Sequence, residues 1–145
     1  MTEMINTWDI KSMTLEELQE YFVKLGEKAF RAKQVYQWMH EKLASSYDEM
    51  SNISKDLREK LQSQGEYTKL NMVQVQESAI DGTRKYLFEL PDGNLVESVW
   101  MKYHHGNSVC ISSQVGCRMG CRFCASTLDG LERNLLPSEM LEQIY

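Results

Sequence analysis

Apolar residues recur every three to four positions over the first third of the chain, which predicts helices that pack on one another. The first run follows a capping box of Thr14 and Glu17 and ends at Gly26. The three apolar stripes are Leu15, Leu18, Phe22 and Leu25; then Ala32, Val35, Tyr36, Met39 and Leu43; and, in a helix that begins near Ser54, Ile53, Leu57 and Leu61. We therefore expect a three-helix domain over residues 1–66.

After Gly65 the apolar period shortens toward two residues, which is typical of strands. Turn signals at Asp81-Gly82 and at Pro91 to Asn94 separate three alternating runs, which are Met72 to Gln76, Arg84 to Leu90 and Leu95 to Met101. We expect short antiparallel strands, in a β segment or linker over residues 67–106. A polar loop from Lys102 to Asn107 is expected to follow them.

The remaining residues, 107–145, predict one strand and one helix with a loop between them. Val109 to Ser113 has the pattern of a strand, and Pro137 begins a helix that continues to Tyr145. This order is that of the first βα unit of a parallel barrel, whose sites lie at the C-terminal ends of its strands. The chain is thus expected to have an α+β fold.

All four cysteines lie between positions 110 and 124, and three of them form the pattern Cys117-x-x-x-Cys121-x-x-Cys124. Three thiolates so spaced can converge on a [4Fe-4S] cluster and leave one iron free to bind a substrate or cofactor. A structural zinc site typically pairs two Cys-x-x-Cys knuckles, and this segment has one. A disulfide needs an oxidising compartment, whereas the polar residues from Met1 to Ser12 do not resemble a secretory signal. The spacing therefore favours an iron-sulfur cluster.

Two further motifs flank these cysteines, and two others lie nearer the N-terminus. They are Ser-Gln-Val-Gly-Cys at residues 113–117, Phe-Cys-Ala-Ser-Thr at residues 123–127, the segment from Phe30 to Trp38, and the run from Met50 to Lys55. Cys110 lies seven residues before Cys117. Together these motifs resemble the RlmN/Cfr family of radical S-adenosylmethionine (SAM) RNA methyltransferases. The members that methylate C2 of adenosine are a closer match than those that methylate C8.

The resemblance implies two cofactors, a [4Fe-4S] cluster and SAM. Cys117, Cys121 and Cys124 are implied to be the metal ligands, and Phe123 is implied to lie beside the cofactor. The implied reaction transfers a methyl group, first carried on a cysteine beyond Tyr145, to C2 of adenosine in ribosomal RNA, transfer RNA or both. The resemblance also implies a radical SAM partial (β/α) barrel of several βα units, of which this sequence supplies the first, so the chain is expected to be a truncated part of a longer protein. The SAM-binding segment is expected beyond Tyr145, and these 145 residues alone are therefore expected to be inactive.

Two further residues match catalytic positions of that family. Cys110 is implied to remove the C2 proton and to form a transient disulfide with the methyl-carrying cysteine; its alternative is a small buried apolar residue. Glu97 matches a Val-Glu-Ser/Thr-Val pattern whose carboxylate accepts a proton, and its alternative is an outward-facing glutamate on a strand.

Composition adds limits on partners and location. The net charge of −5 argues against a protein that coats nucleic acid, although local basic residues can bind phosphate, and the candidates are Arg31, Lys33, Arg118, Arg122 and Arg133. There is no apolar run of the roughly 18 residues that would span a membrane, so we expect a soluble, cytoplasmic protein without a membrane partner.

The resemblance also implies partners, and one other class of function stays open. The helical domain over residues 1–66 is implied to be an accessory domain that positions the RNA. The implied partners are RNA and a reductant protein such as flavodoxin or ferredoxin, and the protein is expected to be a monomer. The alternative is a non-catalytic RNA-binding module whose cysteine site is vestigial or filled by zinc. Analysis of iron, sulfide and zinc after anaerobic purification would separate the two.

Overall fold

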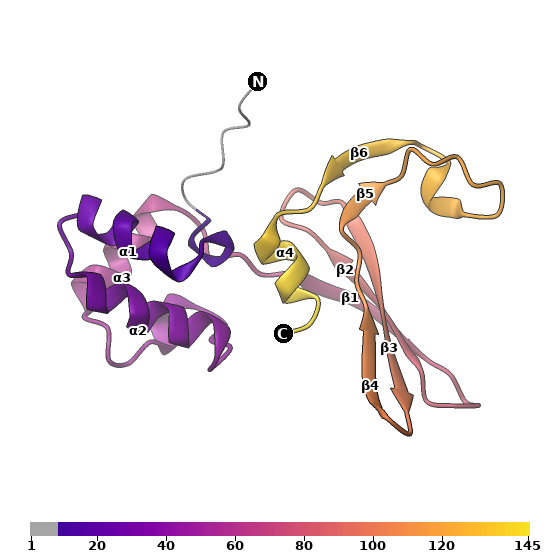
Figure 1. The fold of residues 1–145 in the computed structure, drawn as a ribbon, viewed down its shortest axis with the longest axis horizontal. Helices are drawn as coiled ribbons and strands as arrows, with labels where there is room; N and C mark the ends of the chain where they lie inside the picture. Colours follow the sequence, from indigo (N-terminus) through magenta and orange to yellow (C-terminus); the bar gives the residue numbers. More distant parts are fainter. Residues whose placement is uncertain (1–8) are drawn as a thin grey trace. The chain divides into compact units, whose positions relative to one another are not determined.

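The structure, a computed structural model, describes residues 9–145 and divides into two compact units, Met1–Thr68 and Lys69–Tyr145 (Figure 1). The mixed α and β fold class is confirmed, with helices in the first unit and antiparallel strands in the second. The proposed domain limits at residues 66 and 106 stay predictions. No helix in the described part of the chain is both long enough and apolar enough to cross a membrane.

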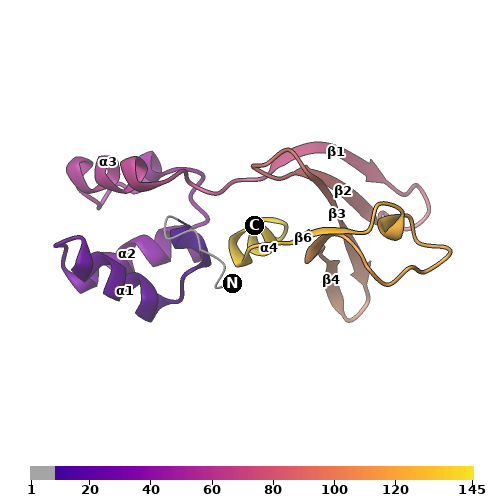
Figure 2. The same cartoon turned by 90° about the horizontal axis from the view of Figure 1, so that it is seen from above.

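The first unit contains three α-helices and two short 3-10 turns. These elements are the turn Ile10–Ser12, α1 Leu15–Lys24, α2 Ala29–His40, the turn Tyr47–Glu49 and α3 Lys55–Gln64. Figures 1 and 2 show α1 and α2 side by side in one layer, with α3 across them in a second. The capping box before α1 is present, because Thr14 N donates to Glu17 Oε2 at 2.7 Å and Glu17 N donates to Thr14 Oγ1 at 3.3 Å. Ser54 caps α3 through its Oγ, which accepts from Leu57 N at 3.3 Å.

The predicted apolar stripes form the core of this unit, with two exceptions, Leu15, which is half-buried outside the core cluster, and Leu43. Fully buried side chains from all three helices and from the segment before α3 meet there, and the largest of them are Leu18, Phe22, Val35, Met39, Met50, Ile53 and Leu61. Leu43, predicted to extend the second stripe, lies beyond the end of α2, is 41% exposed and has a φ of 53°. The apolar spacing therefore predicted a helix that extends beyond the observed end of α2, after which the chain changes direction at Leu43, a residue with a left-handed backbone.

The second unit is built on a four-stranded antiparallel sheet in the order β1-β2-β3-β4. Its strands are β1 Asn71–Glu77, β2 Arg84–Glu89, β3 Leu95–Tyr103 and β4 Gly106–Cys110. A separate two-stranded sheet, β5 Gln114–Gly116 with β6 Leu131–Asn134, precedes the short helix α4 Pro137–Glu142.

Several details of this unit differ from the expectation. The segment predicted to be a loop between one strand and one helix contains the strands β5 and β6, and α4 ends at Glu142 and not at Tyr145. The predicted polar loop from Lys102 to Asn107 is instead a hairpin in which Tyr103 pairs with Gly106, because polar side chains on an exposed face suit a strand as well as a loop. The strand expected at Val109 to Ser113 begins earlier and ends at Cys110, where Cys110 pairs antiparallel with Val99. The residues before the cysteine loop therefore have a sheet neighbour.

α4 covers one face of the sheet. Val96 and Ser98 on β3 are buried on that face, and Ser98 Oγ lies 3.1 Å from Gln143 Oε1, just after α4. Gln143 also accepts from Ser112 N and donates to Ser112 O, both at 2.8 Å. Since side chains alternate between faces along a strand, the neighbouring residues of β3 point to the other face.

Arg133 joins three parts of the second unit. Its guanidinium binds Glu139 of α4 through two bonds of 2.8 Å and donates through Nε to Asp92 Oδ2 at 2.7 Å, in the turn between β2 and β3. Glu139 also accepts from Leu136 N at 2.8 Å. Because both carboxylates already neutralise Arg133, we remove this residue from the candidate phosphate ligands.

Replacing Phe22 by Ala should destabilise the first unit by about 3–5 kcal/mol, since Phe22 is fully buried and its loss leaves a cavity among three helices. The neighbouring change Val23→Ala, at a side chain that is 61% exposed, should shift stability by no more than about 0.5 kcal/mol. Urea unfolding followed by far-UV circular dichroism measures both. Equal effects of the two changes would contradict the assigned core.

The second unit should lose stability as the pH falls through about 2. The hydrogen bond from Arg133 lowers the pKa of Asp92 to about 2, from an ordinary value near 3.8. The carboxylate therefore stabilises the fold fully above its ordinary pKa, and this contribution is lost as the pH falls between the two values. Asp92→Asn should remove this part of the pH dependence, as measured by urea unfolding monitored through amide NMR signals of β2 and β3. A variant with an unchanged acid profile would show that the pair does not couple protonation to folding.

Candidate functional site

The three spaced cysteines lie on a loop whose two ends are closed by β5 and β6. Cys117 N donates to Gly130 O at 3.1 Å, directly after the pairing of Gly116 with Leu131. A Cβ on Gly116 would lie only 1.9 Å from the Gly130 carbonyl oxygen, and the φ of Gly116 is +76°. Only glycine fits this crossing, so Gly116 and Gly130 form the neck of the cysteine loop.

Hydrogen bonds inside the loop involve the cysteines themselves. Met119 N donates to Cys117 Sγ at 3.4 Å, and Cys124 N donates to Cys121 O at 3.2 Å. The Thr127 hydroxyl lies 3.0 Å from Cys124 O and 3.2 Å from Cys121 O, within the 3-10 turn Ala125–Thr127. The loop backbone is thus partly fixed around the cysteines.

All four cysteines are free thiols, and Cys110 and Cys121 are exposed while Cys117 and Cys124 are half-buried. In the part of the chain that the structure describes, no group of three or more Cys, His, Asp or Glu side chains is gathered closely enough to hold a metal ion. The structure therefore places Cys117, Cys121 and Cys124 on one loop without bringing their sulfur atoms together.

The composition of the loop nevertheless fits an iron-sulfur cluster. Its donor set is three thiols, and a backbone N–H already points to one sulfur, an interaction that tunes the potential of such clusters. The loop also carries large apolar side chains that are exposed to solvent, with Phe123 95%, Leu128 80% and Met119 79% exposed. Apolar residues around a metal site limit the access of water to it.

Glu97 and Cys110 lie on the same face of the four-stranded sheet. Val99 pairs directly with Cys110, and Glu97 is two residues from Val99 on β3, so the three side chains share a face. Such a diagonal pair is roughly 7–8 Å apart. This face is opposite to the one that carries Val96 and Ser98 and that α4 covers.

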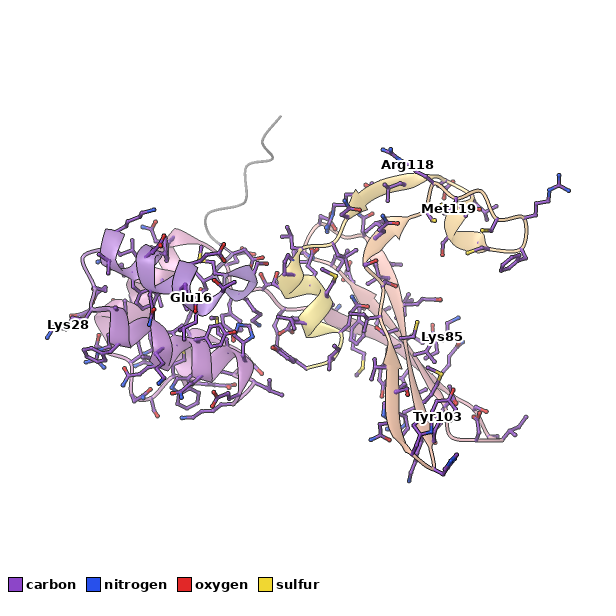
Figure 3. All side chains as sticks on the ribbon, viewed as in Figure 1. Glu16, Lys28, Lys85, Tyr103, Arg118 and Met119 are labelled. Atoms are coloured by element: carbon purple, nitrogen blue, oxygen red, sulfur yellow. The ribbon has the colours of Figure 1, made fainter. Side chains whose placement is uncertain are left out.

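The same face carries Lys85, whose Nζ lies 3.0 Å from Glu97 Oε1. Figure 3 shows Lys85 on the side of the sheet away from α4. Both side chains of this ion pair are about half exposed, so the pair contributes little to stability, but it orients the carboxylate. An oriented carboxylate beside an exposed thiol can accept and pass on a proton.

Sequence reasoning missed two features of the site, which are the Lys85 partner of Glu97 and the neck at Gly116 and Gly130. Lys85 could have been identified from the predicted hairpin of β2 and β3. The register of that hairpin pairs Lys85 with Val99, which lies on the same face as Glu97. The neck has no comparable signal, because it depends on how closely two backbones cross.

Gly116→Ala should destabilise the second unit more than Gly120→Ala does. Both glycines have a positive φ, +76° and +67°, but a Cβ on Gly120 meets nothing within 4 Å. Gly120→Ala should therefore cost about 1–2 kcal/mol from backbone strain alone, and Gly116→Ala should add a backbone clash to that cost. Thermal unfolding of both variants measures the difference, and equal melting temperatures would refute the close crossing.

Comparisons with known proteins give matches over most of the chain. Residues 8–66 match the sequence model of a family described as the ribosomal RNA large subunit methyltransferase N-terminal domain. A probable dual-specificity RNA methyltransferase RlmN from Lachnospira eligens is 69% identical over 137 residues, which are 94% of this chain and 39% of that protein. A relative of the same description from Clostridium novyi is 52% identical over 136 residues, which are 94% of this chain and 40% of that protein.

A solved structure shares the fold as well. The crystal structure of a radical SAM methyltransferase from Sphaerobacter thermophilus superposes with a TM-score of 0.85 at 39% sequence identity, and the match covers 94% of this chain and 40% of that one. The chain thus spans about two fifths of the length of the relatives it matches. On the agreement of motifs, sequence identity and fold, the chain is similar over 94% of its length to part of the RlmN RNA methyltransferases and to part of a radical SAM methyltransferase.

Proposed function

We propose that the whole protein methylates C2 of adenosine in ribosomal RNA, transfer RNA or both, in the cytoplasm. The observation that carries this proposal is the face shared by Glu97 on β3 and Cys110 at the end of β4, seven residues before the first cysteine of the loop. In a barrel whose helices cover the outer face of the sheet, the opposite face lines the interior. α4 lies on the face of Val96 and Ser98, so Glu97 and Cys110 would face inward.

In this proposal Cys117, Cys121 and Cys124 bind a [4Fe-4S] cluster, and Phe123 packs beside the cofactor. When bound, the cluster and SAM supply the radical chemistry needed at a carbon that is neither nucleophilic nor acidic enough for ordinary methyl transfer. The exposed Phe123 lies within the loop, next to Cys124, and would be covered on cofactor binding. The hydrogen bond that Met119 N donates to Cys117 Sγ could be kept when the cluster is bound.

Glu97 and Cys110 are proposed to handle protons and to release the product. The Cys110 thiolate would remove the C2 proton of the adenine after the methyl carbon has been attached and pass it to the Glu97 carboxylate, while the adduct would give up one electron to the bound cofactor. The thiolate would then attack the sulfur of the methyl-carrying cysteine beyond Tyr145, so that the S–S bond forms as the bond between that sulfur and the methyl carbon breaks, and the carbon takes a proton to complete the methyl group. The Glu97 carboxylate, held by Lys85, is the proton acceptor on the same face. The exposure of Cys110 supports this role over that of a buried apolar residue, since a buried thiol could not meet a substrate.

The proposed reaction also requires a protein partner. One-electron chemistry needs a donor, so a reductant protein such as flavodoxin or ferredoxin is required, and the protein acts as a monomer. The competing function is an RNA-binding module with zinc or no metal at the cysteines.

Single replacements Cys117→Ala, Cys121→Ala and Cys124→Ala should each abolish cluster assembly in this chain, because a cubane that loses one of three ligands loses an iron or falls apart. Iron and sulfide, measured after anaerobic reconstitution, should approach about four of each per chain in the unchanged protein, as a [4Fe-4S] cluster requires, and fall to background in each variant.

Cys110→Ala is the matched control, since it removes a thiol seven residues before Cys117 and should leave the iron content unchanged. Stoichiometric zinc in place of iron, or full iron in all three ligand variants, would overturn the proposal. Loss of iron in Cys110→Ala would remove Cys110 from the catalytic role.

A further inference from the structure

The cysteine loop carries exposed arginines and exposed apolar side chains together. Arg118 and Arg122 are both exposed, and each directly follows one of the proposed cluster ligands in the sequence. Figure 3 labels Arg118 and its neighbour Met119, and Figure 1 shows the loop extending beyond β5 and β6 on the side away from α4. Leu128 lies near the other end of the loop, and both apolar side chains are about four-fifths exposed. We call this set, Arg118, Met119, Arg122 and Leu128, the loop surface.

The two arginines of the loop surface are not neutralised by the protein. The second unit contains four arginines, and the other two, Arg84 and Arg133, bind carboxylates at 2.8 Å and 2.7 Å. Among the residues that the structure describes, neither Arg118 nor Arg122 has a hydrogen bond or an ion pair. Their charges therefore remain available to a partner molecule.

The composition of the loop is that of a protein interface. Residues 117–128 contain two arginines, a methionine, a phenylalanine and a leucine, and they contain no lysine, aspartate or glutamate. Asp129, the one acidic residue between the two neck glycines, is adjacent to Gly130. The cores of protein interfaces are enriched in aromatic residues, Met and Arg, and are depleted in Lys, Glu and Asp. In a chain with 26% charged residues, this segment is therefore suited to contact with another protein.

The loop differs from the rest of the chain in the sign of its charge. Residues 117–129 carry a net charge of +1, from two arginines and one aspartate, so the remaining residues carry −6 of the total of −5. Complementary charges across an interface speed the encounter of two proteins and fix their relative orientation. An acidic protein would therefore be attracted to the loop and not to the chain as a whole.

We infer that the loop surface is the docking site of the reductant, a small acidic protein that carries one electron. This inference rests on the function proposed above and adds the surface at which its reductant binds. Arg118 and Arg122 pair with carboxylates of the carrier, while Met119 and Leu128 are covered by its apolar residues. One electron then passes from the reduced carrier to the cluster, so the carrier is oxidised by one electron as the cluster is reduced by one. Phe123 is left out of this surface because the cofactor is proposed to cover it.

RNA is the other acidic partner of the proposed function, and its phosphates could pair with the same two arginines. Phosphates would leave Met119 and Leu128 exposed, whereas a protein covers charged and apolar side chains together. The position of the surface also favours the carrier. An electron donor has to approach the cluster ligands, which lie on this loop, whereas the adenine has to reach the face of Glu97 and Cys110.

The test is the binding of this 145-residue chain, after anaerobic reconstitution, to a purified oxidised flavodoxin and to a purified oxidised ferredoxin, measured by isothermal titration calorimetry. The double change R118Q/R122Q should weaken binding about tenfold at low salt, and the difference should shrink at high salt, which screens the charges. Met119→Gln should weaken binding about fivefold at both salt concentrations, because it removes a buried apolar contact. Iron and sulfide analysis of each variant checks that the cluster is assembled.

The control is K33Q/K102Q, which removes the same charge from exposed lysines on α2 and β3, outside the loop. It should bind either carrier within about twofold of the unchanged chain. Equal weakening by both double variants would overturn the inference, because binding would then follow net charge alone. An unchanged affinity in Met119→Gln, together with RNA binding that depends on both arginines, would also overturn it and would assign the arginines to phosphates.

The iron and sulfide measurement separates this inference from the proposed function. Normal iron loading without binding of either carrier would reject the loop surface and leave the enzymatic function standing. Stoichiometric zinc in the unchanged chain would reject the enzymatic function and, with it, the docking of a reductant.

Discussion

The side chain of Gln143 determines how the second unit is arranged. Its amide pairs with both backbone groups of Ser112 and its carbonyl oxygen lies near the hydroxyl of Ser98, so one buried side chain joins the end of α4 to β3 and to the bend after β4. A buried amide left without partners costs free energy, so these bonds favour one placement of α4. That placement covers the face of Val96 and Ser98 and leaves the opposite face, with Glu97, Val99 and Cys110, uncovered.

The helices and most strands could be predicted from the sequence because local pattern and tertiary packing agree there. Thr14 and Glu17 form the expected capping box, and Phe22, Val35 and Leu61 are buried as their periodicity requires. Periodicity failed at Leu43, where a positive φ ends the stripe. It also failed in the hairpin at Tyr103 and Gly106, since polar residues with a glycine are compatible with either a loop or a tight turn.

The candidate site was predictable in its residues but not in its geometry. Spacing and motif identify Cys117, Cys121 and Cys124, and strand alternation puts Glu97 on one face of β3. The shared face with Cys110 additionally requires the β3–β4 register, which is fixed by a hairpin that the sequence pattern represented as a loop. The neck requires two backbones to cross within contact distance, and the pattern of side chains carries no information on such a crossing.

The cysteine loop combines a fixed neck with thiols that the protein alone does not gather. The close crossing of Gly116 and Gly130 restricts where the loop begins and ends, while Cys121 and the apolar Phe123 remain exposed. Three thiolates brought together without a metal would repel one another, so convergence of the sulfur atoms is favourable only when a metal centre neutralises them. A closed neck reduces the conformational entropy that metal binding must overcome, since only the residues between the two glycines have to be ordered. Under the proposed function, the backbone would provide the position of the site, and a bound metal centre would provide the final arrangement of its ligands.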